Sequence, residues 1–493
     1  MQRKSSIALY IMLLMLGVTI STYLNTINKT ISYDEAYSIF LAKKSYIEII
    51  QITAQDVHPP LYYWFLKIFN LLFSDSLFSF RMFSACGIFA TMLLGCFPIN
   101  RLFGNKVAIL FILLLIIFPV TQFLATDIRM YSWTMFFTLL TAIYAFEAHS
   151  RGYKSDWIIF SVASICCAYM HNYGFLYSIG IYTYLFLVNL QSKRVRKYII
   201  LCFILFIIVY LPWFTQLILQ INSISNDYWI KPLTKNDLFL HIYYFYSPKE
   251  IWLPFTDFRK GQMMVGLIFI IFIQLIITIK VLSTGWIKRD KSMKVIISAF
   301  ILFIFPIMAG FIISILFMPI IVPRYMTCSY GLFLLCFAFI FAKAINLKLY
   351  RKLTYIFLIL LAVDGCIRLY SNTIYYKQTT ESYDQMRLFT NNPNDSNIFV
   401  ANDFSYNVMP RIQVILPGNH YLVLTDTGKE KKFEPFTFKQ VKYLDLDNFI
   451  LVHQDREAIQ DDFWKYWSAL NDTYIIKDSL YATDLRLYKI HRR

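Results

Sequence analysis

Residues 7–40 read IALYIMLLMLGVTISTYLNTINKTISYDEAYSIF, an apolar run that ends shortly before two adjacent acids, Asp34 and Glu35. The apolar run is about 20 residues long, which is the length that an α-helix needs to cross a bilayer. It is longer than the apolar part of a signal peptide, and no small-residue cleavage site follows it. We therefore expect a retained first membrane span that ends close to a pair of carboxylates.

The composition of the chain is that of an integral membrane protein with many spans. The 493 residues are 58% hydrophobic and include 46 Phe and 36 Tyr, and the mean hydropathy is +0.51. The formal net charge is +17, but the basic residues gather in short loops between apolar runs, as the positive-inside rule describes. Because no basic domain with interleaved aromatic residues is visible, nucleic acid is not expected as a partner.

Eleven apolar segments predict the fold class, a polytopic α-helical membrane protein. Loops on one side, such as NRLFGNK, QSKRVRK and GWIKRDKSMK, are rich in Lys and Arg, whereas ATDIRMY, MHNYG and IVPRY on the other side carry few charges. We therefore expect a multi-pass protein of the cell membrane with a cytoplasmic N-terminus. The segments are residues 7–27, 78–99, 106–125, 131–148, 157–170, 175–190, 198–217, 261–281, 295–318, 326–343 and 353–371.

The sequence predicts two domains. Residues 1–371 form the transmembrane domain, which includes an outer loop, 28–77, with the acidic pair. From about residue 372 the chain becomes polar, and 372–493 is expected to be a small extracytoplasmic α/β domain. Strand-like runs there are NIFVAND, IQVILPG, YLVLTD and NFILVHQ, and EAIQDDFWKYWSAL has the pattern of an amphipathic helix.

Ionisable and polar aromatic residues gather at the predicted outer membrane boundary. Each has an ordinary explanation alone, since an arginine at a span end reaches lipid headgroups and a loop acid is commonly solvated. Acids and cations on several separate outer segments nevertheless favour a functional site, because charge near the bilayer is costly. The residues are Asp34, Glu35, Asp56 and His58 in the first loop, followed by Arg81, Arg129, Tyr131, His171 and Arg324.

This combination suits the transfer of a group from a lipid-phosphate carrier. Cations bind phosphate and stabilise its charge as it leaves, and a carboxylate removes the proton of the acceptor. On a helix, adjacent side chains point about 100° apart. Asp34 and Glu35 therefore cannot act on one atom if they are helical, and one of them should position the other or bind something else.

The opening region resembles the type C glycosyltransferases of the dolichyl-phosphate-mannose protein mannosyltransferase family, and bacterial relatives such as the lipid A aminoarabinose transferase. The resemblance rests on YDEAY after the first span, then DVHPPLYYW, LFSFRMFSA and TDIRMYSW, and it covers about residues 1–190. It implies an inverting glycosyltransferase that moves a sugar from a polyprenyl-phosphate donor on the outer face of the membrane. The acceptor would be a lipid, a glycan or a protein of the cell envelope.

The resemblance also implies roles for residues. Asp34 would be the base, Asp56 the second loop acid, and Arg129 a contact of the lipid phosphate. The aminoarabinose transferases carry a lysine ahead of the double proline where this chain has His58, so an amino sugar is not implied. No cofactor is expected, although outer carboxylates could hold a divalent cation, and neither the eight cysteines nor the acids show metal-ligand spacing.

Three other functions stay open from the sequence. A flippase or transporter of lipid-linked sugars would also need outer cations, although such proteins more often carry charges near the middle of the membrane. A polysaccharide polymerase or ligase would use a lipid-pyrophosphate donor, but it gives no reason for the acids after the first span. A non-catalytic membrane scaffold is the last alternative. The C-terminal domain is expected to shape access of the acceptor.

Overall fold

The computed structural model describes residues 2–224, 230–234, 237–248, 257–288, 290, 292–390, 397–402, 407–424, 435–436, 438–441, 443–454 and 470–493. The chain divides into two compact units: Met1–Asn25 with Thr53–Asn372, and Thr26–Ile52 with Thr373–Arg493. The segment with the acidic pair thus belongs to the unit of the C-terminal residues, whereas the predicted division grouped it with the spans.

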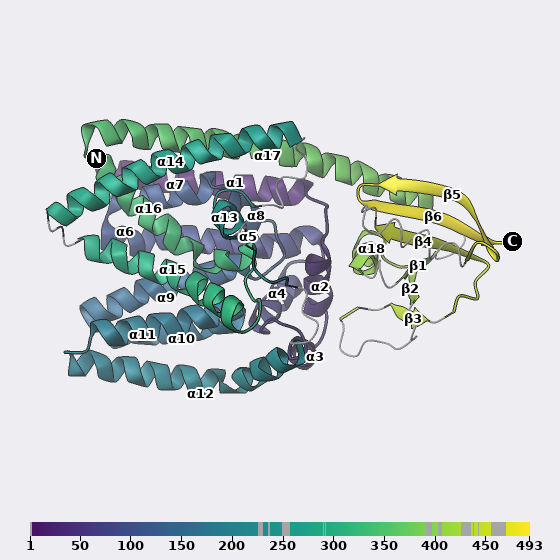
Figure 1. Cartoon of the computed structure of the whole chain (residues 1–493), viewed down its shortest axis with the longest axis horizontal. Coiled ribbons are helices and arrows are strands. Elements are labelled where there is room, and N and C mark those ends of the chain that lie inside the picture. The colour runs from purple at the N-terminus through teal and green to yellow at the C-terminus, as the bar shows by residue number, and fades with distance from the viewer. Residues whose placement is uncertain are drawn as a thin grey trace. The chain divides into compact units, whose positions relative to one another are not determined.

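The first unit is a bundle of helices that lie side by side (Figure 1). Its last helix, α17, contributes residues to both units. The helices are α1 (Gln2–Ile27), α4 (Leu61–Leu72), α5 (Leu77–Leu94), the π-helix η1 (Gly95–Ile99), α6 (Asn100–Phe103), α7 (Asn105–Ile117), α8 (Pro119–Leu124), α9 (Tyr131–Arg151), α10 (Lys154–Met170), α11 (Asn172–Val188), α12 (Lys193–Ile224), α13 (Asp237–Tyr244), α14 (Asp257–Ile287), α15 (Ser292–Leu316), the 3-10 helix η3 (Pro323–Ser329), α16 (Tyr330–Ala344) and α17 (Lys348–Thr390).

All eleven predicted spans are helical, and in the described residues seven helices are long and apolar enough to cross a membrane. The other four predicted spans are not among these seven helices. Helices α7 and α8 together make up one of them, and α9, α10 and α11 are the other three. Helix α9 is less apolar because it carries hydroxyl side chains, of which Thr134 and Thr141 donate to their own backbone at Met130 O and Phe137 O. Such bonds let a buried helix carry polar residues at low cost.

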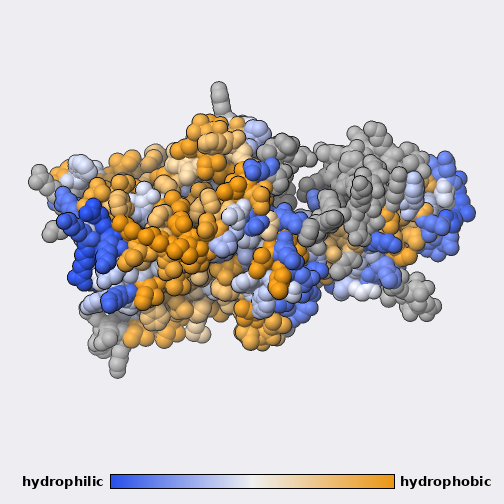
Figure 2. All heavy atoms as spheres, turned by 90° about the horizontal axis from the view of Figure 1, so that it is seen from below, coloured by the Kyte–Doolittle hydropathy of each residue, from blue (hydrophilic) through white to orange (hydrophobic). Residues whose placement is uncertain are grey.

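The sides of the bundle are apolar, as the hydropathy colours of Figure 2 show for one face. Exposed side chains on α12 include Ile204, Leu205 and Ile208, and those on α14 include Phe269 and Phe272. A soluble protein rarely exposes so much contiguous apolar surface. Lipid is the solvent that fits this surface, in agreement with the predicted fold class.

The second unit combines two short helices, α2 (Tyr33–Ala42) and α3 (Tyr46–Thr53), with a helix α18 (Met409–Ile415) and a mixed six-stranded sheet. The strand order is β3-β2-β1-β4-β6-β5. Strands β1 to β4 pair in parallel, and β6 pairs antiparallel with β4 and β5. The strands are β1 (Ile398–Asn402), β2 (His420–Leu424), β3 (Lys439–Val441), β4 (Asn448–Gln454), β5 (Tyr474–Ala482) and β6 (Leu485–Arg492).

Three of the four predicted strand runs are strands, but IQVILPG was predicted wrongly, because Ile412–Ile415 belongs to α18. Met409, Ile412, Ile415 and Leu416 are all buried, and their spacing of three and four residues is that of one helix face. The predicted helix EAIQDDFWKYWSAL, residues 457–470, lies outside the described residues except for its last one.

Candidate active site

The acidic pair lies in the first turn of α2 in the second unit. Ser32 is the N-cap, and its hydroxyl accepts the Glu35 N–H at 3.2 Å, while the Glu35 Oε2 accepts the Ser32 N–H at 2.9 Å. This reciprocal capping box satisfies two backbone donors that a helix start leaves open. Glu35 is buried and Asp34 is half-buried. Since adjacent helical side chains point about 100° apart, the carboxylates of Asp34 and Glu35 point in different directions.

In the first unit, the ends of several helices bring together six side chains, here called the histidine–arginine cluster. The rings of His58 and His171 are 5.2 Å apart, and the rings of His171 and Tyr325 are 4.9 Å apart. The Arg324 guanidinium lies 6.0 Å from the Tyr325 ring centre. The cluster consists of His58, Arg129, Tyr131, His171, Arg324 and Tyr325; all but Arg324 are buried, and Arg324 is half-buried.

The starts of three helices meet at this cluster. His58 comes just before α4, Arg129 just before α9, and His171 is the N-cap of α11. The N-terminal end of a helix carries a partial positive charge and open backbone donors, which favour a bound anion. The helix ends therefore add to the positive charge of the two arginines.

Both histidines of the cluster are held in the neutral form. Burial, followed by the charges of Arg129 and Arg324, lowers the pKa of His171 to about 3. Burial and the charge of Arg129 likewise lower the pKa of His58 well below its usual value. At neutral pH the net charge of the cluster thus comes from the two guanidinium groups, and the imidazoles act through hydrogen bonds.

The tautomer of His171 follows from its contacts. Its Nδ1 atom accepts the Tyr173 backbone N–H at 3.0 Å, so in the neutral ring the proton is on Nε2. Among the described residues, nothing bonds to this buried Nε2 or to the buried His58 Nδ1. Leaving buried polar atoms unsatisfied is costly. The His171 Nε2–H is therefore a donor available for a ligand.

Side chains from neighbouring helices hold the loops of the cluster in place. Asn172 Nδ2 donates to Val57 O at 2.8 Å, next to His58, and Gln220 Nε2 donates to Thr53 O at 2.9 Å. The buried Arg81 donates through Nη1 to Thr126 O, three residues before Arg129. Arg81 thus fixes the turn ahead of α9.

The nine predicted site residues do not all lie together in the structure. His58, Arg129, Tyr131, His171 and Arg324 belong to the cluster. Arg81 supports the turn that precedes Arg129, and the half-buried Asp56 lies two residues before His58 in the same loop. Asp34 and Glu35 belong to the second unit.

One member of the cluster, Tyr325, and one residue beside it, Tyr173, were not among the nine predicted site residues. Tyr325 follows Arg324 in VPRY, and its ring contacts those of His58 and His171. Tyr173 lies 5.6 Å from Tyr325, and a side chain at Gly310 would meet its hydroxyl. Tyr325 could have been included because it directly follows Arg324, whereas no sequence feature distinguishes Tyr173.

No group of three or more His, Cys, Asp or Glu side chains comes together as a metal site in the described residues.

Comparisons with known proteins agree with this architecture. Residues 57–215 match the family model of dolichyl-phosphate-mannose-protein mannosyltransferases. The match confirms the predicted resemblance and the predicted class of enzyme, a glycosyltransferase that uses a polyprenyl-phosphate-linked sugar. No curated protein matches the chain.

Two solved structures share the fold. The crystal structure of ArnT from Cupriavidus metallidurans in the apo state is 10% identical, covers 99% of this chain and 98% of its own, and has a TM-score of 0.61. The structure of ArnT from the same organism bound to undecaprenyl phosphate is also 10% identical, covers 97% of each chain, and has a TM-score of 0.55. At this identity they confirm the fold, a polytopic helical protein with a C-terminal mixed sheet.

Proposed function

From the family match of residues 57–215, we propose that this protein moves a sugar, with inversion, from a polyprenyl-phosphate donor to an acceptor of the cell envelope. The observation that carries the proposal is the buried cluster with two guanidinium groups and the His171 Nε2–H donor. Its charge and donors match a lipid phosphate. The structural relative ArnT from Cupriavidus metallidurans binds undecaprenyl phosphate, which supports the same class of donor here.

The proposed reaction is a single displacement at the anomeric carbon. A hydroxyl of the acceptor attacks, the new C–O bond forms, and the bond between the sugar and the phosphate oxygen breaks with its electron pair on phosphate. Arg129, Arg324 and the His171 Nε2–H stabilise the added negative charge. Asp34 accepts the proton of the acceptor hydroxyl, the role that the family resemblance implies for it.

The outer side of the membrane is part of the proposal. Its support is the contrast between basic loops such as QSKRVRK and loops such as MHNYG and IVPRY at the other end of the spans, which carry few Lys and Arg residues. A polyprenyl-phosphate donor suits that side, because the lipid carries the activated sugar where nucleotide sugars are scarce. If a reporter that is active only in the cytoplasm were active when fused to the C-terminus, this orientation would be contradicted.

A direct test uses purified protein in detergent with a panel of polyprenyl-phosphate sugars and an envelope extract as acceptor. We expect release of free polyprenyl phosphate together with labelled product. Transfer of sugar from a nucleotide sugar in the absence of any lipid carrier would refute the proposed class of donor. Movement of lipid-linked sugar across vesicles without cleavage would instead indicate a flippase.

A further inference from the structure

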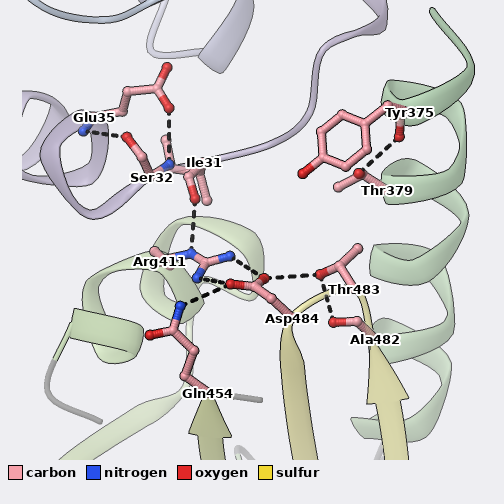
Figure 3. Close-up of polar contacts among 10 residues, drawn as sticks. All are labelled: Ile31, Ser32, Glu35, Tyr375, Thr379, Arg411, Gln454, Ala482, Thr483 and Asp484. Carbon is pink, nitrogen blue, oxygen red and sulfur yellow. Dashed lines mark hydrogen bonds and ion pairs between the residues drawn. The ribbon is translucent and has the colours of Figure 1, made fainter. Parts of the chain in front are cut away.

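Arg411 of α18 is held among several partners in the second unit (Figure 3). Its Nη1 and Nη2 atoms each donate to a carboxylate oxygen of Asp484 at 2.8 Å. Gln454 Nε2 donates to Asp484 Oδ2 at 3.0 Å, and the Thr483 hydroxyl contacts Asp484 Oδ1 at 3.3 Å. A forked pair of this kind fixes the plane and direction of the guanidinium group.

The third donor of Arg411 reaches the segment that carries the acidic pair. Its Nε atom donates to the backbone carbonyl of Ile31 at 2.9 Å. Ile31 directly precedes Ser32, the N-cap of α2, whose capping box with Glu35 lies in the same view (Figure 3). The bond thus links the sheet of the second unit, through one arginine, to the residue that directly precedes the N-cap of the helix with Asp34.

The Asp484 end of this link lies in a tight turn and is ionised. Asp484 lies in the turn between β5 and β6, next to Thr483, whose backbone has a φ of 59°. This conformation is strained for a β-branched residue, and the carboxylate of the next residue, Asp484, accepts from Arg411. Burial raises the pKa of Asp484, but its hydrogen bonds with Arg411 and the charge of that arginine outweigh burial and lower the pKa to about 2.

A second contact, between aromatic rings, holds the body of α2. The Phe436 ring lies 5.7 Å from the ring of Tyr33, 6.0 Å from that of Tyr37 and 5.7 Å from that of Phe40. These three residues follow one side of α2 at helical spacing. The aromatic contact holds the body of the helix, and Arg411 holds its start.

We propose that Arg411, fixed by Asp484, is a positioning residue that sets the first turn of α2 and with it the Asp34 carboxylate. This inference rests on the proposed function, in which Asp34 is the base. It gives the C-terminal residues a part in catalysis beyond the predicted control of acceptor access. A small displacement of a reacting group lowers the rate steeply, so losing the Arg411 Nε–H should reduce turnover more than donor binding.

The first test measures hydrogen exchange of the backbone amides in residues 31–40 in the full-length protein, which needs no substrate. In Arg411→Ala we expect these amides to exchange about 10-fold faster or more, because the start of the helix opens more often. Arg492→Ala is the matched control, since Arg492 pairs with Asp445 at an exposed site of the same unit. Unchanged exchange in Arg411→Ala would overturn the proposal, whether or not the protein transfers sugar.

The second test separates positioning from simple stability with the exchanged pair Arg411→Asp with Asp484→Arg. This double variant keeps an ion pair but places the guanidinium on the far side of the link from Ile31 (Figure 3). We expect it to recover thermal stability relative to Arg411→Ala. Its kcat should stay about 10- to 100-fold below the wild-type value with an unchanged KM for the donor.

The outcomes distinguish the inference from the function on which it rests. Recovery of full kcat in the exchanged pair would show that Arg411 serves stability alone and would overturn the positioning role. Wild-type kcat in Arg411→Ala would overturn it as well. A wild-type protein that turns over no polyprenyl-phosphate donor would instead refute the proposed function, and the exchange data would still decide whether Arg411 holds α2.

Discussion

His171 accepts the backbone N–H of Tyr173 at its Nδ1 atom, at 3.0 Å, which places the proton of the neutral ring on Nε2. The ring is buried, and its neighbours Arg129 and Arg324 disfavour a second proton. The imidazole is therefore fixed as a neutral donor beside two cations. A lipid phosphate gains a hydrogen bond from such a ring and charge from the arginines.

Replacing His171 by Phe should weaken binding of polyprenyl phosphate by about 10-fold or more, because a hydrogen bond to a charged group is lost. His171→Gln, which keeps a donor close to the Nε2 position, should restore part of the affinity. The measurement is the Kd of polyprenyl phosphate in detergent. His149→Phe, at an exposed position at the other end of α9, serves as the control. Equal affinity of His171→Phe and wild type would remove His171 from the phosphate site.

Asp34→Asn should lower turnover by about 10²- to 10⁴-fold, the usual cost of losing a general base. Donor affinity should change little, because the acceptor proton moves only in the reaction. Turnover and donor Kd are measured separately on the same preparation, with the exposed loop acid Asp75 changed to Asn as the control. Near-normal turnover in Asp34→Asn would end the assignment and move the role to Asp56 or Glu35.

Glu35 should behave as a capping residue. Gln can take its place in a capping box, so Glu35→Gln should keep most of the activity, whereas Glu35→Ala should destabilise α2 by about 1 kcal/mol and lower turnover. Glu48 forms the same box with Ser45 at the start of α3 and is exposed, so Glu48→Ala controls for the loss of a cap elsewhere. If Glu35→Gln were as inactive as Asp34→Asn, Glu35 would itself take part in the chemistry.

Arg129→Lys should bind donor lipid about 10-fold more weakly and turn it over more slowly, since charge remains but the planar fork is lost. The phosphate is bound in both the ground state and the transition state, so both constants change. Donor titration and initial rates check this, with the exposed Arg387→Lys as control. Unchanged affinity in Arg129→Ala would leave Arg129 as a structural residue at a span end.

Sequence reasoning named five of the six cluster residues, because ionisable and polar side chains are easily recognised at the ends of apolar runs. Arg129, His171 and Arg324 stand at the ends of apolar runs, where an ionisable side chain is costly and thus noticeable. The helices were also predictable, because an apolar run of about 20 residues is typical of a membrane-spanning helix.

The link through Arg411 could not be predicted in this way. In MPRIQVI the arginine has the pattern of an ordinary surface residue, and its role depends on Ile31 and Asp484, which lie 380 and 73 residues away. The same segment was predicted to be a strand, because a short apolar run does not separate a strand from a buried helix. Contacts between distant segments decide both points.

The low pKa of His171 predicts how stability of the ligand-free protein depends on pH. The pKa falls from 6.5 to about 3 in the folded protein, so the folded state binds fewer protons than the unfolded state between these values. The contribution of the neutral His171 ring to the free energy of unfolding is complete above pH 6.5 and is lost as the pH falls toward 3. Each pH unit within this range should cost about 1.4 kcal/mol through this one group.

The measurement is unfolding in detergent at several values from about pH 7.5 down to about pH 4.5, a range that brackets the ordinary histidine pKa. His171→Phe should lose stability less steeply than wild type as the pH falls, because it lacks this group. Added polyprenyl phosphate should flatten the wild-type slope, since a bound anion makes protonation of His171 easier. Identical slopes in His171→Phe and wild type would mean that His171 titrates normally in the folded protein, and the neutral-donor role would then be wrong.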